Sequence, residues 1–368
     1  MPLVDRPSLD KARYEMEVCN ACRYCEGYCA VFPAMMRRRE FTDGDLNYLA
    51  NLCHGCKACF HACQYAPPHQ FGINVPQTLA SLRAETYAQY AWPRPLAVLY
   101  RKNGVTVAVV VALGIALVLG GLAFLKPEAL TTGQGGEGAF YRVIPWRVMA
   151  GAAGLSLLWS MLALTMGGIR FWRDTGGGLA KGGAAAQAIH SVLTLRYLGG
   201  GHDGQDGCND VGESFSQERR AFHHALFYGF GLCFASTCVA FVYDHFLFRA
   251  APYPLTSAPV ILGTAGGAAM MIGAGGMAWL KAVSDPRPEA RQVLGGDYAL
   301  LALLFAAAAT GIGLLALRDT DAMPVVLAVH MGVILSLFAL LPYSKMVHGL
   351  YRGLALLRSA AEAKQEGS

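Results

Sequence analysis

Charged side chains are scarce in this sequence. Asp, Glu, Lys and Arg make up 15% of its 368 residues, whereas 54% are hydrophobic and 43 are glycine. Ordinary soluble domains contain about 25% charged residues, so this composition argues against a soluble protein and indicates a membrane protein. The formal net charge of +5 is modest, and it does not suggest a nucleic-acid partner.

Three other patterns are missing. No G-x-G-x-x-G fingerprint follows a strand pattern, so we expect no flavin or nicotinamide site. Residues 1–18 carry several charges and no apolar core, so we expect no secretory signal and place this region on the cytoplasmic side. No carboxylate or lysine lies at the middle of a long apolar run. Coupled transporters usually have such a charged residue or a broken helix there, so its absence weighs against the alternative that the chain is a transporter with a metal-cluster sensor domain.

Cysteine, by contrast, is concentrated in one stretch. Eight of the eleven cysteines lie between Cys19 and Cys63, in two copies of the spacing C-x2-C-x2-C-x3-C. This spacing is typical of [4Fe-4S] ferredoxins, in which the fourth cysteine of each motif ligates the other cluster. The sequence therefore predicts two [4Fe-4S] clusters, one held by Cys19, Cys22, Cys25 and Cys63 and the other by Cys53, Cys56, Cys59 and Cys29.

Zinc and disulfide bonds are the alternative uses of these cysteines. Zinc sites built from four cysteines also contain C-x2-C pairs, but such pairs usually lie about a dozen or more residues apart. Disulfides would need an oxidising compartment. One departure affects the cluster motif, because Ala30 and Gln64 replace the proline that usually follows the last cysteine. All eight cysteine ligands are still present, but the sequence does not predict the conformation of the turn that follows each motif.

Helical patterns surround and follow the cysteines. Thr42 offers a helix start, and no alternating β pattern lies between the motifs. Pro76 to Trp92 reads as an amphipathic helix, and aromatic and basic residues typical of a membrane interface come next. Six apolar runs near or above the roughly 20 residues that cross a bilayer as a helix follow: Val105–Phe124, Val148–Ile169, Ala225–Phe248, Ala258–Leu280, Tyr298–Leu317 and Val325–Met346.

These patterns predict an all-α fold, with a cytoplasmic α-helical two-cluster ferredoxin-like domain followed by a six-helix transmembrane bundle. We expect the cluster domain in residues 1–75, an interfacial linker helix in residues 76–104, and the six-span membrane domain in residues 105–350. The membrane domain would include a cytoplasmic loop at residues 170–222, and residues 351–368 would form a cytoplasmic tail.

Basic residues predict the orientation. Thirteen Lys and Arg residues lie in the segments after the second, fourth and sixth runs, and five lie after the first, third and fifth. The positive-inside rule therefore puts both termini and the clusters in the cytoplasm. We expect a multi-pass protein of the cytoplasmic (inner) membrane.

Histidines occur on only two of the six runs, at or just beyond both ends. His223, His224 and His245 belong to the third run, and His330 and His348 to the sixth. Ionisable groups in spans are costly and usually functional. His330 and His348 are eighteen residues apart, about five turns of helix. One continuous helix would therefore place both on one face, at opposite membrane surfaces.

Pairing histidines of like depth predicts axial ligands for haem b, with one imidazole from each helix. His223 or His224 would pair with His348 on the cytoplasmic side, and His245 would pair with His330 on the outer side. His223 is preferred because its offset from His245 around the helix is about 40°, against about 60° for His224. Alternatively, these histidines only anchor helix ends at a hydrated interface, so the sequence leaves one haem or two open.

With these motifs in place, the chain resembles the tricarballylate-utilisation protein B family, also called citrate-utilisation protein B. The resemblance runs nearly end to end. It implies a membrane electron carrier with two [4Fe-4S] clusters and haem b, which reoxidises the reduced flavin of an FAD-dependent partner dehydrogenase and delivers electrons to the quinone pool. In that family the partner converts tricarballylate to cis-aconitate. The resemblance rests on Cys19-Asn20-Ala21-Cys22-Arg23-Tyr24-Cys25, Cys53-His54-Gly55-Cys56-Lys57-Ala58-Cys59 and Arg219-Arg220-Ala221-Phe222-His223-His224.

A second redox function competes with this one. The membrane subunit of a heterodisulfide-reductase-like or nitrate-reductase-like complex also combines clusters with haem-binding helices, and it would pass electrons from quinol to a cytoplasmic acceptor. In both cases the chain is an electron-transfer component without a substrate-converting site, so we expect no catalytic residues. Its partners would be a soluble redox protein, membrane quinone and the lipid bilayer.

Overall fold

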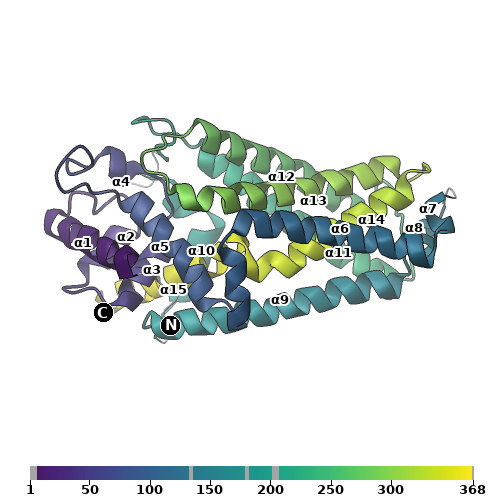
Figure 1. Cartoon of the computed structure of the whole chain (residues 1–368), viewed down its shortest axis with the longest axis horizontal. Helices are drawn as coiled ribbons and strands as arrows, with labels where there is room; N and C mark the ends of the chain where they lie inside the picture. Colours follow the sequence, from purple (N-terminus) through teal and green to yellow (C-terminus); the bar gives the residue numbers. More distant parts are fainter. Residues whose placement is uncertain (1–5, 132–135, 179–181, 201–206, 367–368) are drawn as a thin grey trace.

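The computed structural model of the chain is described for residues 6–131, 136–178, 182–200 and 207–366. These residues form an all-α fold without a strand, and their β pairing is limited to an isolated bridge between Cys208 and Ser216. The predicted fold class is confirmed. Figure 1 shows an elongated molecule in which long helices run along the axis and the helices around the cysteine motifs lie at one end.

Within the described residues, six helices are long and apolar enough to cross a membrane, as in a multi-pass membrane protein. They correspond to the six predicted runs, and their surfaces carry exposed apolar side chains such as Phe124, which is 86% exposed. Such surfaces are stable in lipid and unfavourable in water. The six helices are α6 (Asn103–Leu125), α9 (Trp146–Asp174), α11 (Glu218–His245), α12 (Ala258–Val283), α13 (Leu294–Leu317) and α14 (Met323–Leu340).

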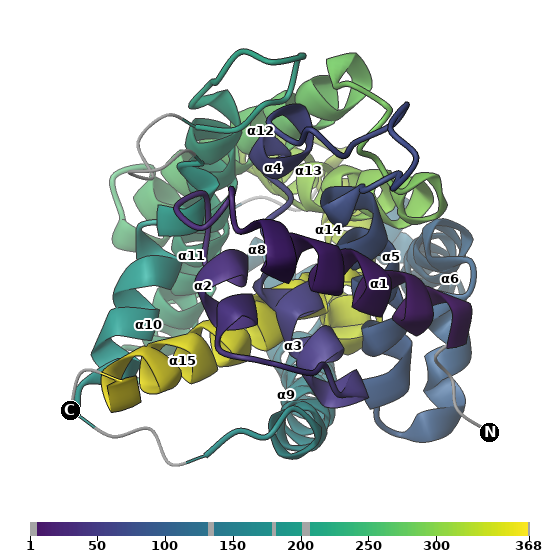
Figure 2. The same cartoon turned by 90° about the vertical axis from the view of Figure 1, so that its left-hand side faces the viewer.

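Shorter helices lie at the two ends of this bundle, and Figure 2 shows several of them across the near end. The far end in Figure 1 carries α7 (Glu128–Thr131) and α8 (Ala139–Val143). The cysteine end carries α1 (Arg6–Cys22), α2 (Val31–Met36), α3 (Asp43–Leu52), α4 (Ala58–His61), α5 (Val75–Tyr90), α10 (Ala184–Leu193) and α15 (His348–Glu366). Short 3₁₀ helices connect elements: η1 (Arg94–Tyr100), η2 (Arg196–Leu198), η3 (Arg291–Val293), η4 (Leu341–Tyr343) and η5 (Lys345–Val347).

Local sequence explains where α3 and α5 begin. The Thr42 hydroxyl accepts a hydrogen bond from the Asp45 N–H at 3.1 Å, and the Asp45 carboxylate accepts one from the Thr42 N–H at 3.3 Å, which is a capping box. Asn74 caps α5 by accepting from the Gln77 N–H at 3.3 Å. Both predicted helices are present, and the apolar face predicted for the second is buried: Leu79, Leu82, Tyr87 and Tyr90.

One apolar core joins the helices of the cysteine end to the C-terminal helix. Buried residues of α1, α3 and α5 pack in the same cluster as Tyr351 and Ala355 of α15. Glu362 holds α15 in place, because its carboxylate accepts from Arg38 at 2.6 Å and from the Tyr48 hydroxyl at 3.2 Å. The segment expected as a tail is therefore largely helical and part of a core. The predicted domain limits stay a prediction.

The sixth helix is shorter than the sequence predicts. α14 ends at Leu340, and the chain passes through η4 and η5 before α15 begins at His348. Pro342 has no N–H to continue the helical hydrogen bonds, and Ser344 is extended, with φ −127° and ψ 178°. The expectation that His330 and His348 lie on one face of a single helix is therefore wrong, because His348 begins a separate helix.

Glycines allow α11 and α12 to lie very close together. A Cβ atom on Gly266 of α12 would lie 2.8 Å from the Cys233 nitrogen and 2.8 Å from the Gly229 oxygen, both on α11. Small residues allow this close approach of helix backbones in membranes. Gly275, on the same helix, has no atom within 4 Å of its Cβ position. The close packing fixes the position of α11, which carries His223.

Replacing Gly266 with leucine should lower the melting temperature of the full chain in detergent, because overpacking a tight contact costs about 1–3 kcal/mol. Thermal unfolding followed by loss of helical circular dichroism measures the change. Gly275→Leu adds the same side chain to the same helix in open space and should leave the melting temperature nearly unchanged. Equal melting temperatures for the two variants would contradict this packing.

Candidate metal centres

The four predicted ligands of the first cluster lie around one cavity. Cys19 and Cys22 are in the last turns of α1, Cys25 follows that helix, and Cys63 lies just beyond α4. All four line a cavity of about 280 Å³, together with Tyr24, Phe32 and Tyr65. The structure thus brings the fourth cysteine of the second motif to the first three of the first motif, which the exchange of ligands between motifs requires.

The second set of cysteines is more deeply buried. Cys53 and Cys56 are 7% and 6% exposed. Burial raises the pKa of the Cys29 thiol well above its usual value, and the neighbouring Cys56 and Cys53 raise it further. Burial also raises the pKa of Cys59, again with Cys56 and Cys29 beside it. Cys29 therefore lies among the three closely spaced cysteines of the second motif, although its role as a ligand stays a prediction.

Both sets fit an iron–sulfur cluster. Burial raises the pKa of Cys25 to about 12 and that of Cys56 to about 11, so ligating thiolates need positive charge beside them. At Cys63, the backbone N–H groups of Tyr65 and Ala66 provide part of this positive charge. In the described part of the chain, no three His, Cys, Asp or Glu side chains are close enough to hold one metal ion.

The loop that carries Cys53 and Cys56 is bonded to three helices, one of which is a membrane helix. The backbone oxygen of Cys53 accepts hydrogen bonds from Arg83 of α5 at 2.6 Å and from Arg352 of α15 at 2.9 Å. The oxygen of Gly55 accepts one from Arg219, in the first turn of α11, at 2.9 Å. Charged donors make the stronger hydrogen bonds in proteins, so three helices fix the position of this loop.

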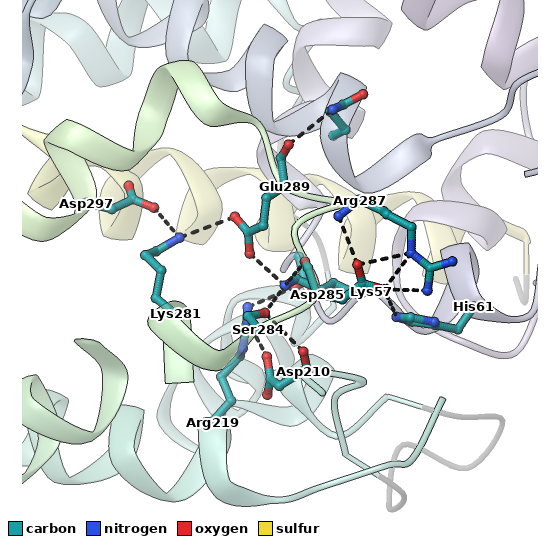
Figure 3. Close-up of polar contacts among 12 residues, drawn as sticks. Lys57, His61, Asp210, Arg219, Lys281, Ser284, Asp285, Arg287, Glu289 and Asp297 are labelled. Carbon is teal, nitrogen blue, oxygen red and sulfur yellow. Dashed lines mark hydrogen bonds and ion pairs between the residues drawn. The ribbon is translucent and has the colours of Figure 1, made fainter. Parts of the chain in front are cut away.

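Ion pairs hold the same loop to the ends of α12 and α13, as Figure 3 shows. Lys57, next to Cys56, is 3% exposed and pairs with Glu289 at 2.6 Å. Lys281 pairs with Glu289 at 3.4 Å and with Asp297 at 2.8 Å. Removing one partner of a buried ion pair costs about 3–5 kcal/mol. These contacts therefore hold the loop that carries Cys56 and Lys57 at a fixed distance from the membrane helices.

The inner histidines face each other across α11 and α15. The ring centroids of His223 and His348 are 6.2 Å apart, with an angle of 78° between the planes. Metal–imidazole bonds of about 2.0–2.1 Å place the centres of two axial rings roughly 6 Å apart. The His348 Nδ1 donates to the Lys345 oxygen at 2.6 Å, which leaves Nε2 free, as in many metal-binding histidines. The pair fits the predicted axial ligands.

The other candidate histidines have different neighbours. His224 lies beside Tyr228, with ring centroids 5.8 Å apart. His245 stacks on Trp146 at 5.6 Å, and His330 Nδ1 lies 2.9 Å from the Thr310 hydroxyl. Among the described contacts none joins His245 to His330, so the outer pair stays a prediction. The structure brings His223, rather than His224, to His348.

His54 and Arg352 belong to this site, although the sequence analysis did not single them out. His54 Nδ1 donates to the Leu52 oxygen at 2.8 Å. Burial lowers the pKa of His54 well below its usual value, and the neighbouring Arg352 and His223 add to this effect. The signals were present in the sequence, because His54 lies inside the second cysteine motif and Arg352 follows His348 by one helical turn.

Comparison with known proteins finds one family. A family model described as the Fer4-like domain of citrate utilization protein B matches residues 12–97, and a model described as citrate utilization protein B matches residues 101–368. A curated citrate utilization protein B from Escherichia coli is 47% identical over 351 residues, which cover 95% of this chain and 91% of that protein. No solved structure matches the chain.

The exchange of ligands between motifs can be tested at Cys63. In Cys63→Ser the iron content should fall by about half, and the electron paramagnetic resonance spectrum of the reduced protein should match that of Cys19→Ser. If each motif held its own cluster instead, Cys63→Ser would match Cys53→Ser. Cys238→Ser, an exposed position on α11, should keep all of the iron.

Proposed function

The chain belongs to the citrate utilization protein B family, and from this membership and its cysteine and histidine sites we propose that it carries electrons from a soluble flavoprotein into the membrane. The donor would be an FAD-dependent dehydrogenase, in this family one that oxidises tricarballylate, and the acceptor would be the quinone pool. The Fer4-like domain supports an iron–sulfur electron-transfer role. The partner, haem b and quinone are parts of the proposal.

The observation that carries the proposal is that the second cysteine motif lies against the two helices that carry the inner histidines. Arg352 donates to the Cys53 oxygen at 2.9 Å and lies one turn beyond His348 on α15. His54, inside the second motif, has His223 as an electrostatic neighbour. The two groups of ligands therefore belong to neighbouring segments that contact each other.

The residues of the chain hold and separate the redox groups. When bound, [4Fe-4S] clusters and haem b each take up and release one electron at a time. Cys19, Cys22, Cys25 and Cys63 would hold the outer cluster, and Cys53, Cys56, Cys59 and Cys29 the inner one. His223 and His348 would hold haem b, and the hydrogen bond from His348 to Lys345 would orient that ring.

The first cysteine set would receive electrons from the partner. Its cavity lies at the end of the molecule away from the long helices, and Tyr24 beside it is 60% exposed. A protein donor can reach this surface, whereas the second set is covered by α5, α11 and α15. Electrons would therefore pass from the first set to the second and then to the inner histidines.

The proposed location is the cytoplasmic membrane, with the cysteine end in the cytoplasm. The first and last described helices, α1 and α15, lie at this end of the molecule in Figure 1, and the excess of Lys and Arg belongs to the same side. This orientation would expose the first cysteine set to soluble dehydrogenases.

Replacing either inner histidine should remove haem b from the purified chain. His223→Leu and His348→Leu should lose the haem absorbance and lower the rate of electron transfer from a reduced flavoprotein to decylubiquinone by at least about tenfold. Iron in the clusters should remain. His224→Leu is the matched control and should keep both the absorbance and the rate.

Haem retained by both His223→Leu and His348→Leu would contradict this ligand pair.

The direction of electron transfer is tested separately. Reduction of the haem by flavoprotein and substrate supports the proposed direction, and reduction only by quinol would instead support the transfer of electrons to a cytoplasmic acceptor.

A further inference from the structure

A second cavity lies where the cysteine end meets the membrane helices. It has a volume of about 340 Å³ and is enclosed by α5, the segment from η1 into α6, and the first turn of α13. Its polar lining includes Arg83, Tyr87, Tyr100, Asp297 and Lys345. None of these residues was assigned to a cluster or a haem, so the cavity is separate from the metal centres.

The rim of this cavity is amphipathic. Val105, in the first turn of α6, is 60% exposed on a helix that is apolar enough to cross the bilayer. Arg101 and Lys102 precede it and are also exposed, as basic residues at a membrane interface usually are. A ligand with an apolar tail and a polar head group could therefore enter from the lipid and place its head group inside.

One buried hydroxyl in the cavity has no acceptor for its proton among the described residues. Tyr87 is 5% exposed, and the Arg83 guanidinium lies beside its hydroxyl oxygen as a donor, so the hydroxyl proton is left for a ligand. Other polar groups of the lining are already bonded: Tyr100 donates to the Pro342 oxygen at 2.7 Å, and Asp297 pairs with Lys345 at 2.5 Å. A buried hydroxyl proton without an acceptor is unfavourable, and a ligand carbonyl oxygen would provide that acceptor.

Two residues in the wall of the cavity form hydrogen bonds with the proposed redox ligands. Arg83, in its wall, donates to the Cys53 oxygen at 2.6 Å. The backbone oxygen of Lys345, another wall residue, accepts from His348 Nδ1 at 2.6 Å. A molecule in this cavity would thus be separated from each set of ligands by a single residue.

We propose that this cavity binds the head group of a membrane quinone. The inference rests on the proposed function and locates its last step. The Tyr87 hydroxyl would donate to one quinone carbonyl, and the cations of the lining would stabilise negative charge on the reduced ring. Two electrons arrive singly through the chain, each carbonyl oxygen takes one proton from water at the exposed rim, and quinol leaves into the lipid.

Gly295 provides a direct test. It lines the cavity, and its Cβ position has no atom within 4 Å, so Gly295→Phe should fill the cavity without disturbing the fold. The matched control is Gly313→Phe, because Gly313 is on the same helix and also has an open Cβ position. Tyr87→Phe removes only the hydroxyl and keeps the ring.

The readout is reoxidation of the chemically reduced full chain by decylubiquinone in nanodiscs, followed at the haem and cluster absorbance. Gly295→Phe should slow reoxidation by roughly tenfold or more, and Tyr87→Phe should raise the KM for the quinone about three- to tenfold. Both variants should keep the wild-type iron and haem content. Gly313→Phe should behave as wild type.

The possible failures are distinguishable. If the wild-type chain is not reoxidised by decylubiquinone, the proposed function and this site both fail. If the wild type is reoxidised and Gly295→Phe is equally fast, only the site is wrong. Crosslinking with an azidoquinone gives a second readout, and label in residues 80–105 that disappears in Gly295→Phe supports the site. If the azidoquinone does not label the wild-type chain, and Gly295→Phe loses a bound anionic phospholipid, the cavity is a lipid site and the proposal is wrong.

Discussion

The backbone oxygen of Cys53 accepts hydrogen bonds from two arginines, and the arrangement of the redox residues depends on this shared acceptor. Arg83 and Arg352 come from α5 and α15 and form no ion pair with a carboxylate among the described residues. Burial and the nearby Arg83 lower the pKa of Arg352 to about 10, and Cys53 acts in the opposite direction. Two neighbouring cations in a dry environment need compensating negative charge, and four ligating thiolates would provide it. The loop of the second cysteine motif is thereby held between the soluble end and the inner histidines.

Sequence spacing predicted the parts of this site that depend on local geometry. The repeated cysteine spacing was enough to place Cys63 with Cys19, Cys22 and Cys25, and the structure gathers these four around one cavity. The apolar runs identified six helices, because a membrane span needs a long apolar segment whatever its neighbours are. Helix starts at Thr42 and near Pro76 followed from capping and proline rules.

Features that depend on tertiary packing were harder to predict. Apolar periodicity continued through Pro342, so the sequence did not reveal that α14 stops and that His348 begins another helix. The close approach of the His223 and His348 rings results from this break and from the packing of α15, rather than from one straight helix. Similarly, the last residues read as a polar tail, although Tyr351 and Ala355 are buried in the core of the cysteine end. Helical periodicity alone cannot say which neighbour an amphipathic helix will pack against.

The central claim is that electrons must pass through the second cysteine set to reach the membrane. The most direct measurement is rapid mixing of Cys59→Ser, in nanodiscs, with a reduced flavodoxin, a protein donor confined to the aqueous side. Cluster and haem absorbance are followed together. We expect the first cluster to become reduced at the wild-type rate while the haem stays oxidised. Haem reduction at the wild-type rate in this variant would contradict the account.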